Sequence, residues 1–271
     1  MPAMISGSEK GFSDFSTLSI LLAIFIAVTG LISFRYSRGL DKSYTPSIDA
    51  APSLLTILSQ IVKNKVFVIF FIAYFVAYAG VAINSTLALY YYEYKLGLNN
   101  KQVAAILLVF IVFWLASAFI WLRLSQKIGK KKSAFSGVFF LGLLTSVSYP
   151  FFPPESLVFP MIMSVIGGFL VGSIFLFDSL LADLADEDSQ RSGVEKEGAY
   201  FGFAKFAMKS SRSIAVGISG ILLGVIHFSP NTEQSVSTKF QLGLLFGPVV
   251  GFFFILSALV FLFMPWQEKK A

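Results

Sequence analysis

The chain has 271 residues, of which 56% are hydrophobic and only 13% are charged. Soluble globular domains average about 25% charged residues, so this composition excludes an ordinary soluble protein and indicates a protein that crosses a membrane several times. The net charge of +6 comes from basic residues clustered in loops, which indicates topology rather than nucleic-acid binding. The absence of cysteine excludes disulfides and thiolate metal sites.

Seven apolar runs are long enough to cross a bilayer core, which takes about 20 helical residues. They are 15–34, 66–92, 103–122, 134–152, 157–182, 200–228 and 241–264. The sequence therefore predicts an all-α membrane protein with seven transmembrane helices. The polar N-terminal residues lack a cleavable-signal pattern, so the first run is expected to remain in the mature protein.

The longest segment between two runs is 35–65. After Pro52 its apolar residues recur at helical spacing, which predicts an amphipathic helix on the cytoplasmic membrane surface. These apolar residues are Leu54, Leu55, Leu58, Ile61 and Val62. The expected parts of the chain are residues 1–34 with the first transmembrane helix, the linker 35–65, and a six-helix bundle at 66–271.

Basic residues between the runs indicate the orientation of the chain. Segments 35–65, 123–133 and 183–199, with the C-terminus, hold fourteen Lys and Arg residues, whereas the remaining segments outside the runs hold four. The positive-inside rule places the first set in the cytoplasm, which predicts a multi-pass cell (inner) membrane protein with its N-terminus outside and its C-terminus inside. Lys130 and Lys131 should then be cytoplasmic and Glu155 external.

The run 200–228 contains three cations at Lys205, Lys209 and Arg212, whose spacing places them on one helix face. A charged residue within the membrane costs about 2.5–3.5 kcal/mol and usually faces a polar cavity. Lys209 lies ~14 Å from the start of the run, near the middle of a ~30 Å core, and is expected to line the transport cavity. Lys205 and Arg212 share its helix face, so they are expected to line the cavity as well. Lys205 is nearer the cytoplasm, and its ammonium is expected to extend back to that surface.

Three other polar residues fall within apolar runs. Asp178 should lie at a depth similar to that of Lys205, and it is either half of a structural ion pair or a carboxylate that carries a proton. Asn84 and Thr86 either face the same cavity or, in the case of the hydroxyl, bond to their own helix backbone.

The segment 183–199 is predicted to be a short cytoplasmic loop with more acids than cations. Asp183 and Asp186 should therefore seek cations at the cytoplasmic ends of neighbouring helices. Arg123 and Lys127 are the candidates by sidedness.

The order of residues around this loop matches a known pattern. An acidic pair, a polar loop, Glu-Gly, Phe-Gly-Phe and a lysine follow one another as Asp183, Asp186, Glu197, Gly198, Phe201, Gly202, Phe203 and Lys209. The stretch from Lys63 to Phe67, the tyrosines of 90–94 and Pro248 fit as well. Residues 60–264 thus resemble the second half of the glycoside–pentoside–hexuronide cation symporters, which are relatives of melibiose permease in the major facilitator superfamily.

This resemblance implies the last helix of a first half plus a six-helix major facilitator-type half bundle. The implied function is symport of a sugar or another small polar solute with Na⁺ or H⁺, without a cofactor. The implied partners are the solute, the lipid bilayer, and either the missing N-terminal half bundle, which holds the family's coupling-cation carboxylates, or a second copy. A cytoplasmic gate of acids and cations would use Asp183, Asp186, Arg191, Glu197 and Arg123.

A seven-helix membrane receptor or sensor is the alternative, because seven spans with the N-terminus outside suit that class too. A retinal-binding pigment would need a lysine in the last run, and 241–264 has none. The sequence contains no nucleophile–base pair, phosphate loop or cofactor motif, so an enzyme is not expected. His227 is the single histidine, and a metal site is not expected either.

Overall fold

The computed structural model describes residues 8–37 and 54–265 of the chain. Within these ranges the regular structure is helical, with no strand. The chain divides into two units, one up to Ala51 and one from Pro52 onward. The boundary between the units falls inside the segment predicted as a linker, 35–65.

The described part of the first unit is the helix α1 (Ser8–Ser37). Its side chains from Ser19 to Ser37 are exposed. Apart from Arg35 in its last turn, this stretch has no charged residue. It contains most of the run 15–34 that was predicted from hydrophobicity.

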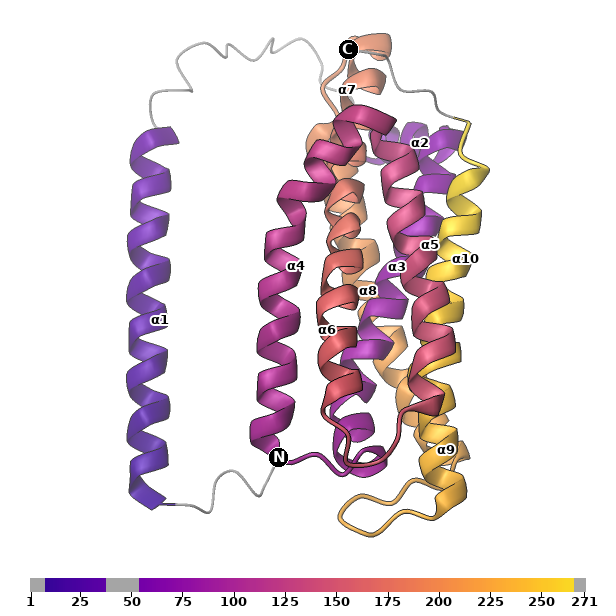
Figure 1. Ribbon diagram of the computed structural model, residues 1–271. Helices are drawn as coiled ribbons and strands as arrows, with labels where there is room; N and C mark the ends of the chain where they lie inside the picture. Colours follow the sequence, from indigo (N-terminus) through magenta and orange to yellow (C-terminus); the bar gives the residue numbers. More distant parts are fainter. Residues whose placement is uncertain (1–7, 38–53, 266–271) are drawn as a thin grey trace. The chain divides into compact units, whose positions relative to one another are not determined.

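The second unit is a bundle of helices that run up and down in succession (Figure 1). Its elements are α2 (Leu54–Lys63), α3 (Lys65–Tyr90), η3 (Tyr91–Lys95), α4 (Asn100–Ile128), α5 (Lys130–Ser148), η4 (Tyr149–Phe151), α6 (Val158–Val171), η5 (Gly172–Ile174), α7 (Phe175–Ser192), α8 (Glu197–Val225), α9 (Val236–Leu244), η6 (Leu245–Val249) and α10 (Val250–Leu262). The π-helical turns η3 and η6 and the 3₁₀ turns η4 and η5 continue the helices that they adjoin.

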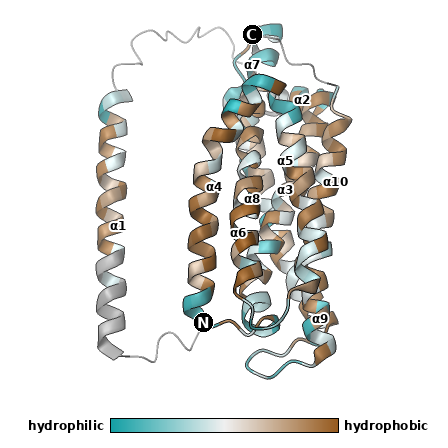
Figure 2. Cartoon of the chain, in the orientation of Figure 1, coloured by the Kyte–Doolittle hydropathy of each residue, from teal (hydrophilic) through white to brown (hydrophobic). Residues whose placement is uncertain are grey.

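Six helical stretches of the described chain are long and apolar enough to cross a membrane. They are Ser19–Ser37, Lys65–Lys95, Asn100–Ile128, Lys130–Phe151, Val158–Ser192 and Val236–Leu262. The remaining predicted crossing, the run 200–228, corresponds to α8. This helix has 29 residues and is therefore long enough, but its cations and serines lower its hydropathy. Figure 2 shows the contrast between the hydrophobic α4 and α6 and the hydrophilic end of the bundle at α7. The crossing by α8 remains a prediction.

Packing in the bundle centres on α3, which lies against both α8 and α10, while α5 packs on α10 and α4 on α6. Large buried rings fill the space between these helices. Phe70 of α3 contacts Phe177 of α7 and Phe261 of α10, with ring centroids 6.0 and 6.3 Å away. Edge-to-face and tilted ring pairs of this kind contribute about 0.5–1.5 kcal/mol beyond the area they bury.

The amphipathic segment after Pro52 forms the predicted helix, α2. Ile61 is fully buried, and the helix packs against α3 and α8, whereas Val62 is exposed. The side chains of Leu54, Leu55 and Leu58 lie outside the described residues. The position of α2 on the membrane surface remains a prediction.

One predicted boundary is wrong. The segment 183–199 was expected to be a loop, but α7 continues through its acidic half to Ser192. Acidic residues do not prevent helix formation where water is available, and the pair of Glu187 with Arg191 at i and i+4 supports the last turns. Gly193 ends the helix with φ +68°, a left-handed conformation that favours glycine.

Candidate functional site

The helix α8 has two chemically different faces. Its buried side chains are small apart from one tyrosine and recur at helical spacing: Tyr200, Ala204, Ala207, Ser211, Ala215 and Ser219. They let α8 lie close to α3. Lys209 and Arg212 lie on other faces and are exposed. Neither has an ion-pair partner among the described residues.

The exposed side of α8 also carries several glycines. Five glycines of α8 have free space beside them, because a Cβ atom added to any of them would meet nothing within 4 Å. They are Gly198, Gly202, Gly217, Gly220 and Gly224. Large apolar side chains are exposed on α8 as well, among them Phe206, Ile214 and Ile221. The exposed side chains of α4 include Leu108, Val112 and Phe119, which are also large and apolar. The exposed face of α4 suits lipid, whereas the exposed side of α8 combines apolar side chains with Lys209, Arg212 and glycines, a mixture that suits contact with another protein segment or water around the cations.

One turn before Lys209, three helices form a polar group that we call the Asp178 cluster, made of Tyr74, Asp178 and Lys205. The Lys205 Nζ lies 3.3 Å from each carboxylate oxygen of Asp178. The hydroxyl of Tyr74, a fully buried residue of α3, donates to Asp178 Oδ1 at 3.3 Å. The side chains of Asp178 and Lys205 are 39% and 45% exposed, so the cluster is open on one side.

These contacts resolve part of what the sequence left open. Asp178 forms an ion pair with Lys205 of the neighbouring helix, which was one of the two alternatives for Asp178. The expected extension of the Lys205 ammonium toward the cytoplasmic surface remains a prediction. Tyr74 was not predicted from the sequence. The signal was the spacing of Tyr74 and Tyr78, which places two phenol rings one turn apart on α3, with centroids 4.5 Å apart.

The polar residues near the middle of α3 behave differently from one another. The Thr86 hydroxyl donates to the carbonyl oxygen of Ala82 at 2.8 Å, so it bonds its own helix backbone, which was one of the two alternatives. Asn84 is half-buried. Its amide has no hydrogen-bond partner within the described part of the chain. A role for Asn84 in the cavity remains a prediction.

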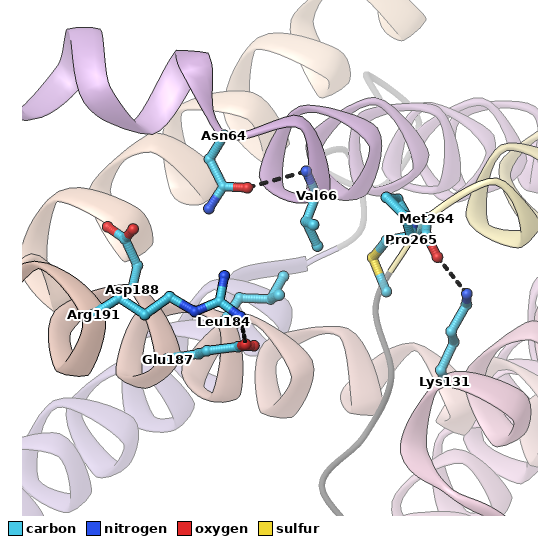
Figure 3. Close-up of a pocket in the computed structure, with 9 residues that line it drawn as sticks. All are labelled: Asn64, Val66, Lys131, Leu184, Glu187, Asp188, Arg191, Met264 and Pro265. Atoms are coloured by element: carbon cyan, nitrogen blue, oxygen red, sulfur yellow. Dashed lines mark hydrogen bonds and ion pairs between the residues drawn. The ribbon is translucent and has the colours of Figure 1, made fainter.

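A second polar site lies at the end of the bundle that carries Lys63, Lys130, Lys131, Arg191 and Lys196, which we call the basic end. A cavity of about 550 Å³ opens there between α3, α5, α7 and the residues after α10 (Figure 3). It is lined by Asn64, Val66, Lys131, Leu184, Glu187, Asp188, Arg191, Met264 and Pro265.

Ion pairs surround this cavity and connect its walls. Lys130 of α5 pairs with Asp183 of α7 at 2.6 Å. Lys196, which is 4% exposed, pairs with Asp188 at 2.9 Å. The amide of Asn64 caps the first turn of α3 with its oxygen and donates to the hydroxyl of Tyr200 with its nitrogen. The start of α3, the end of α7 and the start of α8 are therefore held together at the basic end.

The predicted gate residues are only partly brought together. Asp183 pairs with Lys130 rather than with Arg123 or Lys127, because Lys130 begins α5 beside α7. Arg191 pairs with Glu187 on its own helix. Asp186, Glu197 and Arg123 are exposed, and none of the three has an ion pair with another residue in the ranges that the structure describes.

The sequence of this chain is similar to those of known membrane transport proteins. A family model for the MFS/sugar transport protein family matches residues 1–268. The chain is 25% identical over 277 residues to the isoprimeverose transporter of Lactiplantibacillus pentosus, covering 97% of this chain and 55% of that protein. It is 21% identical over 274 residues to an uncharacterized symporter of Synechocystis sp., covering 94% and 49% of the two chains. It is 25% identical over 236 residues to the uncharacterized symporter YjmB of Bacillus subtilis, covering 83% and 50%.

The chain thus spans about half the length of the curated relatives that it matches. The resemblance to melibiose permease-like symporters is confirmed, and the receptor alternative is not favoured. The matched family is a family of transporters, not of enzymes. Because the family model covers nearly the whole chain, the chain belongs to the MFS/sugar transport protein family.

Proposed function

We propose that the chain is the C-terminal part of a secondary transporter that moves a small sugar-like solute together with Na⁺ or H⁺. Within this assignment the solute occupies a cavity along the exposed face of α8, and the basic end is cytoplasmic. The second wall of the cavity comes from another helical bundle, as expected for transporters that rock two halves around a central site. The length of the relatives, about twice that of this chain, supports the need for that second bundle.

The observation that carries the proposal is the exposure of Lys209 and Arg212 on α8. Lys209 lies 12 residues after Glu197, or ~18 Å along the helix, which is within the depth of a ~30 Å hydrocarbon core. A cation exposed to lipid at that depth would cost several kcal/mol. A water-filled cavity removes that cost, and Lys209 is then placed where a solute passes.

The cavity at the basic end fits the role of a cytoplasmic gate. Its walls come from four parts of the bundle, and ion pairs such as Lys130–Asp183 can break and reform without a change in the core. In this assignment Asp183, Asp186, Arg191, Glu197 and Arg123 act at the gate, where the three exposed residues meet the second bundle. Na⁺ or H⁺ would bind chiefly in that second bundle.

The test is uptake of labelled sugars, with isoprimeverose first, into proteoliposomes under an imposed Na⁺ or H⁺ gradient. The transporter containing this chain and the second bundle should accumulate a sugar, whereas this chain alone should not. Ion-driven accumulation by this chain alone would contradict the need for a second bundle, since a homodimer would then suffice. Failure of the complete transporter with every sugar and both ions would contradict the proposed function itself.

The role of Lys209 is tested in the same assay. Lys209→Ala should abolish accumulation or uncouple it from the ion gradient, while the amount of protein inserted in the membrane stays the same. The matched control is Lys101→Ala, which removes an exposed lysine from the first turn of α4 at the far end of the bundle. Normal coupled uptake by Lys209→Ala would refute the assignment of this lysine to the cavity.

A further inference from the structure

The Asp178 cluster has the chemistry of a solute-binding site that the charge pattern of α8 alone does not predict. We propose that Asp178 and Lys205 bind hydroxyl groups of a neutral, sugar-like solute, and that Tyr74 is the positioning residue for Asp178. This assignment rests on the proposed function and names one subsite within it. The three side chains come from α7, α8 and α3, so the subsite spans three helices of the bundle.

The chemistry of the pair selects for hydroxyl groups. An ionised carboxylate only accepts hydrogen bonds and an ammonium only donates them, whereas a hydroxyl does both. A single solute hydroxyl can therefore donate to Asp178 and accept from Lys205, and two adjacent hydroxyls can each engage one of them. A charged solute is attracted by one group and repelled by the other, since the two lie only 3.3 Å apart. A neutral polyhydroxylated molecule is the ligand that satisfies both.

Burial and exposure divide the roles within the cluster. Tyr74 is fully buried, and its ring is held by the rings of Phe70, Tyr78 and Phe177 at centroid distances of 5.8, 4.5 and 6.1 Å. Its hydroxyl reaches Asp178 from the protein interior and occupies one side of Oδ1. The carboxylate is thereby fixed in orientation, and the half-exposed remainder of the pair is left for a solute.

A purely structural bridge between α7 and α8 is the competing explanation. Such a bridge needs only two opposite charges in contact, and their order on the two helices does not matter. Ion pairs as accessible to water as this one contribute about 0–1 kcal/mol to stability. A binding site, in contrast, needs the carboxylate next to the Tyr74 hydroxyl and the ammonium on α8. Exchanging the two charges therefore separates the explanations.

The experiment uses the complete transporter in proteoliposomes with labelled isoprimeverose as the probe, and it measures KM and Vmax separately. Asp178→Asn and Lys205→Gln should each raise KM at least about tenfold, and Tyr74→Phe about three- to tenfold, with Vmax and inserted protein nearly unchanged. Tyr94→Phe is the matched control. It removes a tyrosine hydroxyl that accepts from the Asn231 backbone at the far end of the bundle, and KM should stay at the parental value.

The double variant with Asp178→Lys and Lys205→Asp completes the test. The proposal expects KM to stay raised, because the carboxylate no longer lies beside Tyr74. A return of KM to the parental value in this variant would overturn the proposal and leave a structural bridge, as would parental KM values in the three single variants. If the parent accumulates no sugar from a panel of neutral mono- and disaccharides, the proposed function fails. If the parent accumulates a sugar and the variants match it, the assignment of this cluster alone fails.

Discussion

The ammonium of Lys95 lies 2.6 Å from the carbonyl oxygen of Pro150, inside the far end of the bundle. Lys95 is 8% exposed and its Nζ lies 5.8 Å from the centroid of the Tyr91 ring. The Tyr91 hydroxyl in turn donates to the carbonyl oxygen of Tyr149 at 2.7 Å. The turn η3, which continues α3, therefore supplies donors to two carbonyl oxygens of η4, the turn that follows α5.

This contact depends on a glycine. A Cβ atom on Gly243 of α9 would lie 2.7 Å from the Lys95 Nζ, so Gly243→Ala should push the ammonium away from Pro150. We expect a loss of about 1–3 kcal/mol in the free energy of unfolding, measured by thermal unfolding in detergent. In a Lys95→Leu background the same change should cost less, because the displaced atom is gone. Equal costs in both backgrounds would show that the two residues are independent.

A second prediction concerns the contact of α5 with α10. A Cβ on Gly251 would lie 2.5 Å from the Gly142 carbonyl oxygen, and a Cβ on Gly142 would lie 2.8 Å from that of Gly251. Backbone atoms cannot rotate away, so either Gly→Ala change must separate the two helices. We expect each change to destabilise the bundle by about 1–3 kcal/mol or more.

The matched control for these variants is Gly217→Ala in α8, where the new methyl group meets nothing within 4 Å. It should be neutral or stabilise the protein slightly, because alanine is the better helix former by about 1 kcal/mol. Unfolding midpoints in detergent give the comparison. A loss of stability at Gly217 equal to that at Gly251 would contradict the packing of α5 on α10.

The ion pair of Lys130 with Asp183 gives a third prediction. Lys130→Asp should place two acids in contact at the basic end and lower both the amount of folded protein and its unfolding midpoint. A second change, Asp183→Lys, should recover a large part of that loss, because the pair is restored in reverse. Arg123→Asp should not be rescued by Asp183→Lys. Purely additive effects of the changes at 130 and 183 would show that the pair contributes no coupling.

The sequence predicted the helices well, because the bilayer constrains where apolar and charged residues can lie along a chain. The apolar runs predicted the long helices, because every backbone polar group in lipid must bond within its own helix. The apolar residues after Pro52 recur at helical spacing, and this periodicity predicted α2. The three cations of α8 pointed to a polar face, and the structure places Lys209 and Arg212 on exposed positions.

The sequence was less informative about pairings. It placed Asp178 at the depth of Lys205 and offered an ion pair as one alternative, but it gave no sign of Tyr74, which is 104 positions from Asp178 and approaches it only through helix packing. The predicted cytoplasmic side of the membrane suggested Arg123 as an ion-pair partner of Asp183, whereas the structure pairs Asp183 with Lys130. Which cation lies near a given acid depends on the rotation of each helix about its axis. The end of α7 was misplaced because a run of acids ends a transmembrane stretch without ending the helix.

The last prediction is the orientation of the bundle in the membrane. The basic end should be cytoplasmic, since it holds most of the cations between the spans. The chain has no native cysteine, so single cysteines report sidedness without interference. Lys132→Cys and Glu233→Cys are suitable because both side chains are exposed and lie at opposite ends of the bundle.

A membrane-impermeant thiol reagent added to intact cells should label position 233 and leave position 132 unlabelled until the membrane is opened. A third variant, Ala199→Cys, tests whether α8 crosses the membrane, because α8 separates position 199 from position 233 in the sequence. Position 199 lies in the first turn of α8 and should behave like position 132. Labelling of position 132 from outside would show that the orientation is opposite to the predicted one. Labelling of positions 199 and 233 from the same side would instead show that α8 does not cross.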